Sequence, residues 1–230
     1  MSELLKFESN EDMQQGLANA IIADLATAIK YRGQGSLVLS GGNTPKRLFQ
    51  ILSTKELDWA KVQVTLADDR WLGEDHTDSN ERLVKDNLLQ GPAAQASFIG
   101  LKTAASSPYE GAADCHKNLS AIPLPYDVTL LGMGTDGHTA SLFPCSDELD
   151  RAVTDDESLC CAVTPKTAPY ERMTLTLKTL LKSSKLYLQL AGDSKLEVYK
   201  SACDGDDEKA MPVRYFLKQE QSPLFVYWAP

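Results

Sequence analysis

The chain has 230 residues, an ordinary composition and a formal net charge of −9, so it is long enough to bury a core of its own. The acidic balance argues against a general surface for nucleic acid or for an acidic membrane. No apolar run approaches the roughly 20 residues that span a bilayer, and the first residues lack the charged-then-apolar pattern of a signal peptide. We therefore expect a cytoplasmic protein that binds neither nucleic acid nor membrane, and its oligomeric state stays open.

The expected elements of the first half alternate between helix and strand. A helix capped by Asn10 carries an apolar residue at every fourth position from Met13 to Ile29. Residues 36–39 and 62–66 are short apolar runs typical of buried strands. Thr44 as N-cap and Pro45 as first helical residue predict that a helix follows, through Lys46, Leu48, Phe49 and Leu52. The other expectations before residue 120 are helices from Ser79 to Gly91 and over 109–119, with no clear pattern over 93–107.

The second half continues the alternation. Its expected elements, in chain order, are a strand over 126–131, an acidic exposed connection over 146–157, a strand over 159–163, an ambiguous segment over 173–181 that begins like a strand and ends like a helix, a strand over 185–190, a helix opened by a capping box of Ser194 and Glu197, a short helix over 212–217 and a strand over 224–228. No Pro- or Ser-rich linker divides the chain. The pattern predicts one doubly wound, mostly parallel, Rossmann-like α/β domain over residues 1–230, with ligands outside the carboxyl ends of the strands.

The five cysteines are odd in number and scattered. They are Cys115, Cys145, Cys160, Cys161 and Cys203. None forms a C-x-x-C pair, so we expect reduced, mostly buried thiols. With histidines that are equally scattered, a zinc site is not expected.

Residues 40–45, Ser-Gly-Gly-Asn-Thr-Pro, join a predicted strand to a predicted helix. Gly41 and Gly42 let the backbone approach a ligand, and free amides at a helix start suit an anion. Lys46 and Lys195 both fall in the first turn of a predicted helix, where a cation opposes the helix dipole at a cost of about 0.3–1 kcal/mol. Two such lysines suggest an anion at this edge of the sheet. The alternatives are a plain tight turn and two lysines that point into solvent.

Two further cationic segments are candidate substrate contacts. Arg70 follows a strand directly, next to Asp68 and Asp69, and offers a guanidinium fork for substrate oxygens. Lys166 and Arg172 lie on a loop stiffened by two prolines, which would suit a clamp. Each segment is equally compatible with ordinary solvated surface charge.

The stretch from residue 132 to 138, Gly-Met-Gly-Thr-Asp-Gly-His, ends a predicted strand in three glycines. Gly132, Gly134 and Gly137 match the dinucleotide pattern G-x-G-x-x-G, but Asp136 would lie close to a pyrophosphate, and no acidic partner on a second strand is evident. We therefore assign this turn to acid–base chemistry. A carboxylate near an imidazole favours its charged form and fixes its orientation, which makes Asp136 and His138 candidate catalytic residues.

Taken together, these motifs resemble the 6-phosphogluconolactonase family, in order along nearly the whole chain. The similar segments are residues 40–45, Asp68-Asp-Arg70 with Ser79-Asn80, the signature Gly-Met-Gly-Thr-Asp-Gly-His-Thr-Ala-Ser-Leu-Phe-Pro over 132–144, Arg-Met-Thr-Leu-Thr over 172–176, and Gly192 with Lys195. Two departures are small. Asn43 stands where many members carry serine, and Asp69 replaces the usual glutamate.

The resemblance implies the fold that the family shares with glucosamine-6-phosphate deaminases, ribose-5-phosphate isomerases and CoA transferases. It implies hydrolysis of 6-phospho-D-glucono-1,5-lactone to 6-phosphogluconate, a pentose phosphate pathway step, with no metal or redox cofactor. On this reading His138 deprotonates water and Asp136 supports it. The amides of residues 41–43 (Gly41, Gly42, Asn43), or Arg70, stabilise the oxyanion. The candidates to hold the phosphate are Thr44, Lys166, Arg172 and Lys195.

Two other functions stay open. Glucosamine-6-phosphate deaminases share Gly137-His138 but continue toward Ala-Phe-Asn-Glu-Pro and carry tyrosine in place of Arg70. This chain reads Thr-Ala-Ser-Leu-Phe-Pro after His138, which favours the lactonase. The scaffold also resembles sugar-phosphate sensor domains of regulators, but no helix-turn-helix precedes residue 36.

Overall fold

The computed structural model describes residues 3–230 and is built on a seven-stranded sheet. Its strand order is β1-β10-β9-β6-β2-β3-β5, and every neighbouring pair is parallel. The strands are β1 (Glu3–Lys6), β2 (Gly35–Leu39), β3 (Val62–Leu66), β5 (Ser97–Ile99), β6 (Tyr126–Leu131), β9 (Ser183–Ala191) and β10 (Leu224–Ala229). β2 and β6 lie in the middle of the sheet and are buried along their whole length, as expected when helices cover both faces of a parallel sheet.

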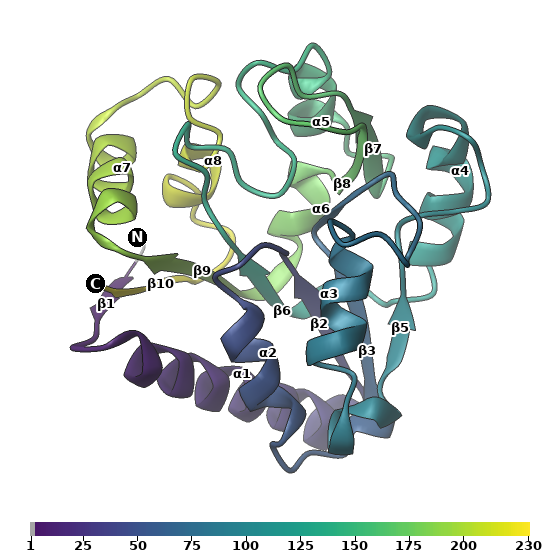
Figure 1. The fold of residues 1–230 in the computed structure, drawn as a ribbon, viewed down its shortest axis with the longest axis vertical. Helices are drawn as coiled ribbons and strands as arrows, with labels where there is room; N and C mark the ends of the chain where they lie inside the picture. The colour runs from purple at the N-terminus through teal and green to yellow at the C-terminus, as the bar shows by residue number, and fades with distance from the viewer. Residues whose placement is uncertain (1–2) are drawn as a thin grey trace.

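A second, three-stranded sheet is antiparallel and has the order β4-β8-β7. Its strands are β4 (Asp68–Arg70), β8 (Arg172–Leu175) and β7 (Cys160–Val163). Residue Ala67 joins the two sheets, because its amide donates to Leu39 of β2 and its carbonyl accepts from Leu175 of β8. Figure 1 shows this small sheet beside the ends of β2 and β3, next to α5. The expected mostly parallel α/β sheet is confirmed, with this small antiparallel sheet as an addition.

Eight α-helices and two 3₁₀ turns connect the described strands. They are α1 (Asn10–Arg32), α2 (Lys46–Ser53), η1 (Trp59–Lys61), α3 (Asn80–Asn87), η2 (Gly91–Gln95), α4 (Pro108–Leu119), α5 (Leu149–Thr154), α6 (Leu177–Leu181), α7 (Asp193–Asp204) and α8 (Arg214–Leu217). No helix within residues 3–230 is long and apolar enough to cross a membrane. The two ends of the chain lie together, because β1 pairs with β10 (Figure 1).

Helix α1 shows how the sequence pattern produces the layer below the sheet. Ser9 caps the helix by accepting the amide of Asp12 at 3.1 Å, and Gly33 ends it in the left-handed region at φ 78°. The four-residue apolar repeat of the sequence forms its buried face, with Leu17, Ile21 and other repeat positions fully inaccessible. The expected cap was Asn10, one residue too late.

Several other boundaries differ from expectation, each for a local reason. Thr44 does not cap α2, whose N-cap is Pro45 without a side-chain bond. Ser194 does not cap α7, because that helix already begins at Asp193 after Gly192, whose φ of 89° turns the chain into it. The elements β1, β4, β5 and α5 were not expected. The ambiguous segment contains both of its alternatives, β8 followed by α6.

All five cysteines are free thiols, as expected, and Cys115, Cys160 and Cys161 are buried. Burial and the neighbouring Cys160 thiol raise the pKa of Cys115 far above its ordinary value, the side-chain contact with Cys160 being the larger cause. The Cys115 sulfur therefore behaves as a neutral core group.

Candidate active site

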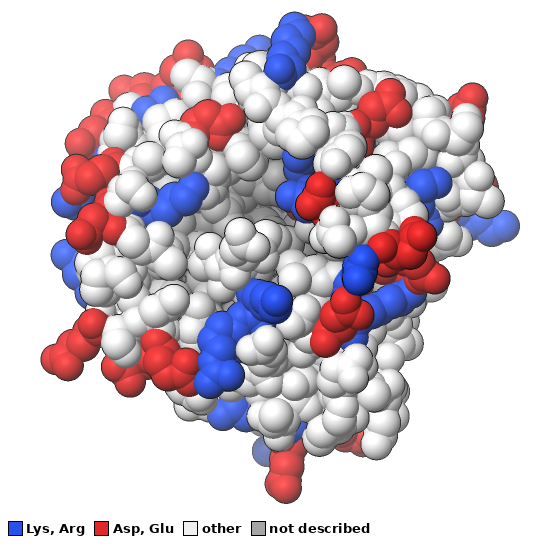
Figure 2. Space-filling view, viewed as in Figure 1, with Lys and Arg blue, Asp and Glu red and all other residues white. Residues whose placement is uncertain are grey.

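A cavity of about 220 Å³ lies where the strand order reverses, between the carboxyl ends of β2 and β6. This is the place where open α/β sheets bind ligands. Figure 2 shows it as a hollow near the centre of the face, with Lys or Arg atoms at its rim. The polar or charged side chains in its lining are Ser40, Thr44, Asp68, Arg70, Asn80, His138, Thr139, Arg172, Gln189 and Lys195.

The turn after β6 holds an Asp–His pair. Nδ1 of His138 lies 2.5 Å from Oδ1 of Asp136, and the backbone amide of His138 donates to the same oxygen at 3.1 Å. Because a carboxylate only accepts, Nδ1 carries the proton, and Nε2 is the nitrogen left to exchange a proton with a ligand. Partial burial raises the pKa of Asp136, but the hydrogen bond and charge of His138 outweigh it and hold this pKa below its ordinary value.

Steric and backbone constraints explain why glycine occupies positions 134 and 137 of this turn. A methyl group at Gly134 would lie 2.1 Å from Nδ1 of His138 and 2.6 Å from Oδ1 of Asp136. Gly137 has a φ of 78°, a backbone conformation that residues other than glycine rarely adopt. The turn is closed by a bond from the amide of Gly134 to the carbonyl of His138, 2.8 Å long. Gly134 therefore makes room for the Asp–His pair, and Gly137 allows the turn between its two members.

Residues that follow His138 fix its ring. The imidazole stacks on Phe143 with the ring centroids 4.1 Å apart, and the guanidinium carbon of Arg172 lies 5.1 Å from the same phenyl centroid. Thr139 donates to the carbonyl of Gly132 at 2.7 Å, which ties the segment back to the end of β6. The Phe of the family signature is thus a support for the imidazole.

The turn after β2, residues 40–45, which we call the first glycine turn, also lines the cavity. Gly41 packs against Asn80, since a methyl group there would lie 1.9 Å from Oδ1 of Asn80, and Gly42 has a φ of 102°. The carbonyl of Thr44 accepts from Gln14 of α1 at 3.3 Å, and Gln14 in turn accepts from Gln189 of β9 at 2.6 Å. A buried amide chain thereby attaches the turn to the neighbouring helix and strand.

Three of the four cations expected at the site, Arg70, Arg172 and Lys195, line the cavity. Nζ of Lys195 donates to the carbonyl of Met133 at 2.8 Å, so the start of α7 faces the turn after β6. Partial burial lowers the pKa of Lys195, and the charge of Asp136 offsets part of the effect. Burial also lowers the pKa of Arg172, which lies 3.7 Å from Asp68. Arg70 donates to the carbonyl of Asp78 at 2.6 Å.

The structure brings most of the predicted site residues together, but not all. Gly41, Gly42, Thr44, Arg70, His138, Arg172 and Lys195 line the cavity. Asp136 lies outside the lining but is hydrogen-bonded to His138, and Asn43 is in the turn after β2 but not in the lining. Lys166 was expected in a substrate clamp and lies outside the cavity, paired with Asp147 while its side chain is 59% exposed. The loop that carries Lys166 holds this side chain at the surface, so Lys166 is not part of the cavity site. Lys46 is likewise absent from the lining.

Sequence reasoning missed five polar residues of the lining as site residues: Ser40, Asp68, Asn80, Thr139 and Gln189. Asp68 is 5% exposed and accepts from Ser141, while its neighbour Asp69 accepts the amides of Asn80 and Glu81 at the start of α3. The pair Ser79-Asn80 in the family pattern was a signal that could have found Asn80. No cluster of three or more His, Cys, Asp or Glu side chains suited to a metal ion occurs among residues 3–230.

Fold and site together define a class: an α/β protein with an aspartate-paired histidine and three cations in a cavity at the switch point of a parallel sheet. The family model described as glucosamine-6-phosphate isomerases/6-phosphogluconolactonase matches residues 8–226. The chain belongs to this family.

Its relatives support the lactonase branch. The chain is 42% identical to a 6-phosphogluconolactonase of Pseudomonas aeruginosa, covering 96% of this chain and 92% of that one, and 42% identical to one of Rhizobium meliloti over 97% of each. A crystal structure of a 6-phosphogluconolactonase from Shewanella baltica superposes with a TM-score of 0.99 at 46% identity, covering 100% of this chain and 98% of that one. A monomeric glucosamine-6-phosphate deaminase has the same fold, with a TM-score of 0.78 at 19% identity.

Proposed function

We propose that the protein hydrolyses 6-phospho-D-glucono-1,5-lactone to 6-phosphogluconate, the pentose phosphate pathway step named for its relatives. The observation that carries this proposal is the Asp136–His138 pair, placed at a cavity that also holds Lys195, Arg70 and Arg172. A base next to concentrated positive charge suits water attack on an anionic, already activated ester. The substrate is a phosphorylated sugar lactone. The cytoplasmic location expected from the sequence stays a prediction.

Nε2 of His138 takes a proton from water as the water oxygen attacks C1 of the lactone. Asp136 holds the ring in the required tautomer and supports the positive charge that develops on it. The carbonyl oxygen becomes an oxyanion, which backbone amides of residues 41–43 or the Arg70 guanidinium stabilise. When the tetrahedral intermediate collapses, the C1–O5 bond breaks and O5 takes the proton from His138. The product is an open-chain acid, and the histidine returns to its neutral form.

The phosphate is held by the cations and the first glycine turn. Lys195 presents an ammonium whose stem is partly buried, and Arg172 is held almost fully buried, so neither loses much side-chain freedom on binding. Nε of Arg172 and Nε of Arg70 are buried without a partner within the described chain. Unsatisfied guanidinium donors favour an anionic ligand. Thr44, at the start of α2, adds a hydroxyl.

Direct assay tests the proposal: lactone opening with and without the protein, corrected for the spontaneous reaction. We expect the protein to accelerate opening of the phosphorylated lactone. Release of ammonia from glucosamine 6-phosphate would instead indicate the deaminase activity of the other family branch. Binding of 6-phosphogluconate without any acceleration would indicate a sensor.

A further inference from the structure

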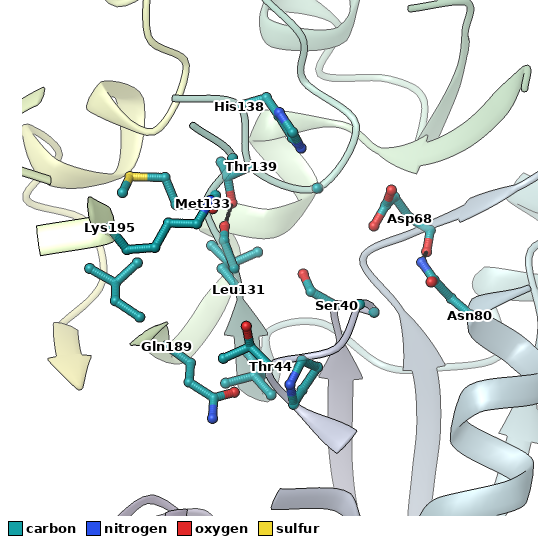
Figure 3. Close-up of a pocket in the computed structure, with 18 of the residues that line it drawn as sticks. Ser40, Thr44, Asp68, Asn80, Leu131, Met133, His138, Thr139, Gln189 and Lys195 are labelled. Atoms are coloured by element: carbon teal, nitrogen blue, oxygen red, sulfur yellow. Dashed lines mark hydrogen bonds between the residues drawn. The ribbon is translucent and has the colours of Figure 1, made fainter. Parts of the chain in front are cut away.

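Besides the two guanidinium nitrogens, two polar atoms in the cavity wall have no hydrogen-bond partner among residues 3–230. They are Oγ of Ser40 and Oδ1 of Asn80, and both side chains are nine-tenths or more buried, with exposures of 6% and 2%. Both residues line the cavity. In Figure 3 the hydroxyl of Ser40 points from the end of β2 into the open space between the labelled side chains. A buried polar atom left unpaired is costly, and a native protein keeps one where a ligand satisfies it.

Both side chains are held in place by their neighbours. The amide of Ser40 donates to Leu130 of β6 at 3.0 Å, which fixes Ser40 at the switch point. Nδ2 of Asn80 donates to the carbonyl of Asp68 at 2.9 Å, so Oδ1, which packs against Gly41, is the end of the amide that has no hydrogen bond and can only accept. The amide of Asn80 is itself fixed by Asp69, at 2.7 Å. The site is therefore built before any ligand arrives.

The charge of this wall shows which ligand group it suits. Asp68 stands beside Asn80, and its carboxylate faces the guanidinium of Arg172 at 3.7 Å, which balances its charge. Figure 3 shows Asp68 and Asn80 on one side of the cavity and Lys195 on the other, with Ser40 between them. An amide oxygen and a carboxylate repel a phosphate but accept hydrogen bonds from neutral hydroxyls. A serine hydroxyl can accept as well as donate.

We infer that Ser40 and Asn80 form a hydroxyl-recognition subsite that reads the ring hydroxyls of the lactone. This inference rests on the proposed lactone hydrolysis and adds its substrate class: a polyhydroxylated ring, as distinct from any lactone that carries a phosphate. Each contact is made while the ring is held for attack by water at C1, so loss of a hydroxyl lowers kcat/KM. A site built to bond a hydroxyl rejects the analogue that lacks it, because its buried groups then stay unpaired.

The test measures kcat/KM for 6-phosphogluconolactone and for its 2-deoxy, 3-deoxy and 4-deoxy forms, made by oxidising the corresponding sugar phosphates. We expect the wild type to discriminate against at least one deoxy lactone by about tenfold or more. Ser40→Ala should lower kcat/KM for the intact lactone by about tenfold and reduce the discrimination at one position toward unity. Asn80→Ala should do so at another position. Ser53→Ala is the matched control, because this buried hydroxyl bonds Gln50 within α2, and it should leave every ratio unchanged.

Identical deoxy ratios in the wild type and Ser40→Ala, at all three positions, would overturn the subsite. A merely structural role for Ser40 would lower all four activities in parallel and is excluded by a change in one ratio only. If the wild type opens no lactone, the proposed function fails separately. Calorimetric binding of 6-phosphogluconate then decides the subsite, with an affinity loss of about tenfold expected in Ser40→Ala and an unchanged affinity counting against it.

Discussion

One carboxylate oxygen, Oδ1 of Asp136, receives both the ring nitrogen Nδ1 of His138 at 2.5 Å and the backbone amide of His138 at 3.1 Å. This double contact fixes the main chain and the ring together, so the direction of Nε2 is set by the turn itself. A packed aromatic ring, Phe143, prevents the imidazole from rotating away. The geometry explains why Asp136 matters although it is not in the cavity lining.

Removing the imidazole tests the base. We expect His138→Ala to lower kcat by at least about 10²-fold, the lower range for general-base catalysis. Steady-state hydrolysis, corrected for spontaneous opening, measures it. His116→Gln is the control, because His116 lies on α4 and bonds the amide of Leu159 away from the cavity. A folded His138→Ala protein with wild-type kcat would remove His138 from the mechanism.

Substitution of one lysine in the cavity and one at the surface tests which of the two binds the substrate. Lys195→Ala should raise KM by about 10- to 100-fold, since hydrogen bonds to charged groups contribute roughly 1.5–3 kcal/mol. Lys166→Ala should leave KM near its wild-type value, because that side chain is paired with Asp147 outside the cavity. Measured KM values for both variants decide between the two placements. An equal rise in both would return Lys166 to the substrate clamp predicted from sequence.

Gly134, which precedes the Asp–His pair, should be required for a normal kcat. Gly134→Ala puts a methyl group 2.1 Å from Nδ1 of His138, so the imidazole must move, and displacements of about 1 Å can cost 10²-fold in rate. We expect kcat to fall by at least about tenfold, with the overall fold retained. Gly132→Ala is the matched control, since no heavy atom lies within 4 Å of an added methyl there. Comparable kcat values for the two variants would contradict the steric argument.

Asp69 makes stability depend on pH. Burial raises the pKa of Asp69 to about 7, although the amides of Asn80, Glu81 and Arg70 act to lower it. The ordinary value is 3.8, so between pH 3.8 and about 7 the folded state binds more protons than the unfolded state. The stability of the wild type should therefore fall as the pH rises through this window.

Asp69→Asn, which cannot ionise, provides the comparison. The difference in unfolding free energy between wild type and Asp69→Asn should shift against the wild type from pH 4 to pH 7. Urea unfolding at several pH values measures it. A difference that is constant across this range, or that shifts in favour of the wild type, would show that the amide bonds dominate and the carboxylate is ionised throughout.

The fold was predictable where a local pattern repeats. The four-residue apolar repeat located α1, and short apolar runs located β2, β3 and β6, because burial on both faces of a parallel sheet demands continuous apolar strands. Elements that escaped prediction lack such a pattern. β1 and β5 are short strands at the two edges of the sheet. β4 consists of two acidic residues and one basic residue, Asp68–Arg70, and its strand conformation comes only from pairing with β8.

By itself, the sequence determined the family and the chemistry of the turn after β6, because Asp136, Gly137 and His138 are adjacent in the chain and their contact is local. It could not decide which distant cations reach the cavity. Lys166 and Arg172 lie on the same predicted loop, yet Arg172 pairs with β4 and turns inward while Lys166 remains in solvent. Nor could it show that Ser40 and Asn80 carry unpaired buried atoms. Burial and hydrogen-bond satisfaction depend on segments far apart in the chain, and only the tertiary structure brings those segments together.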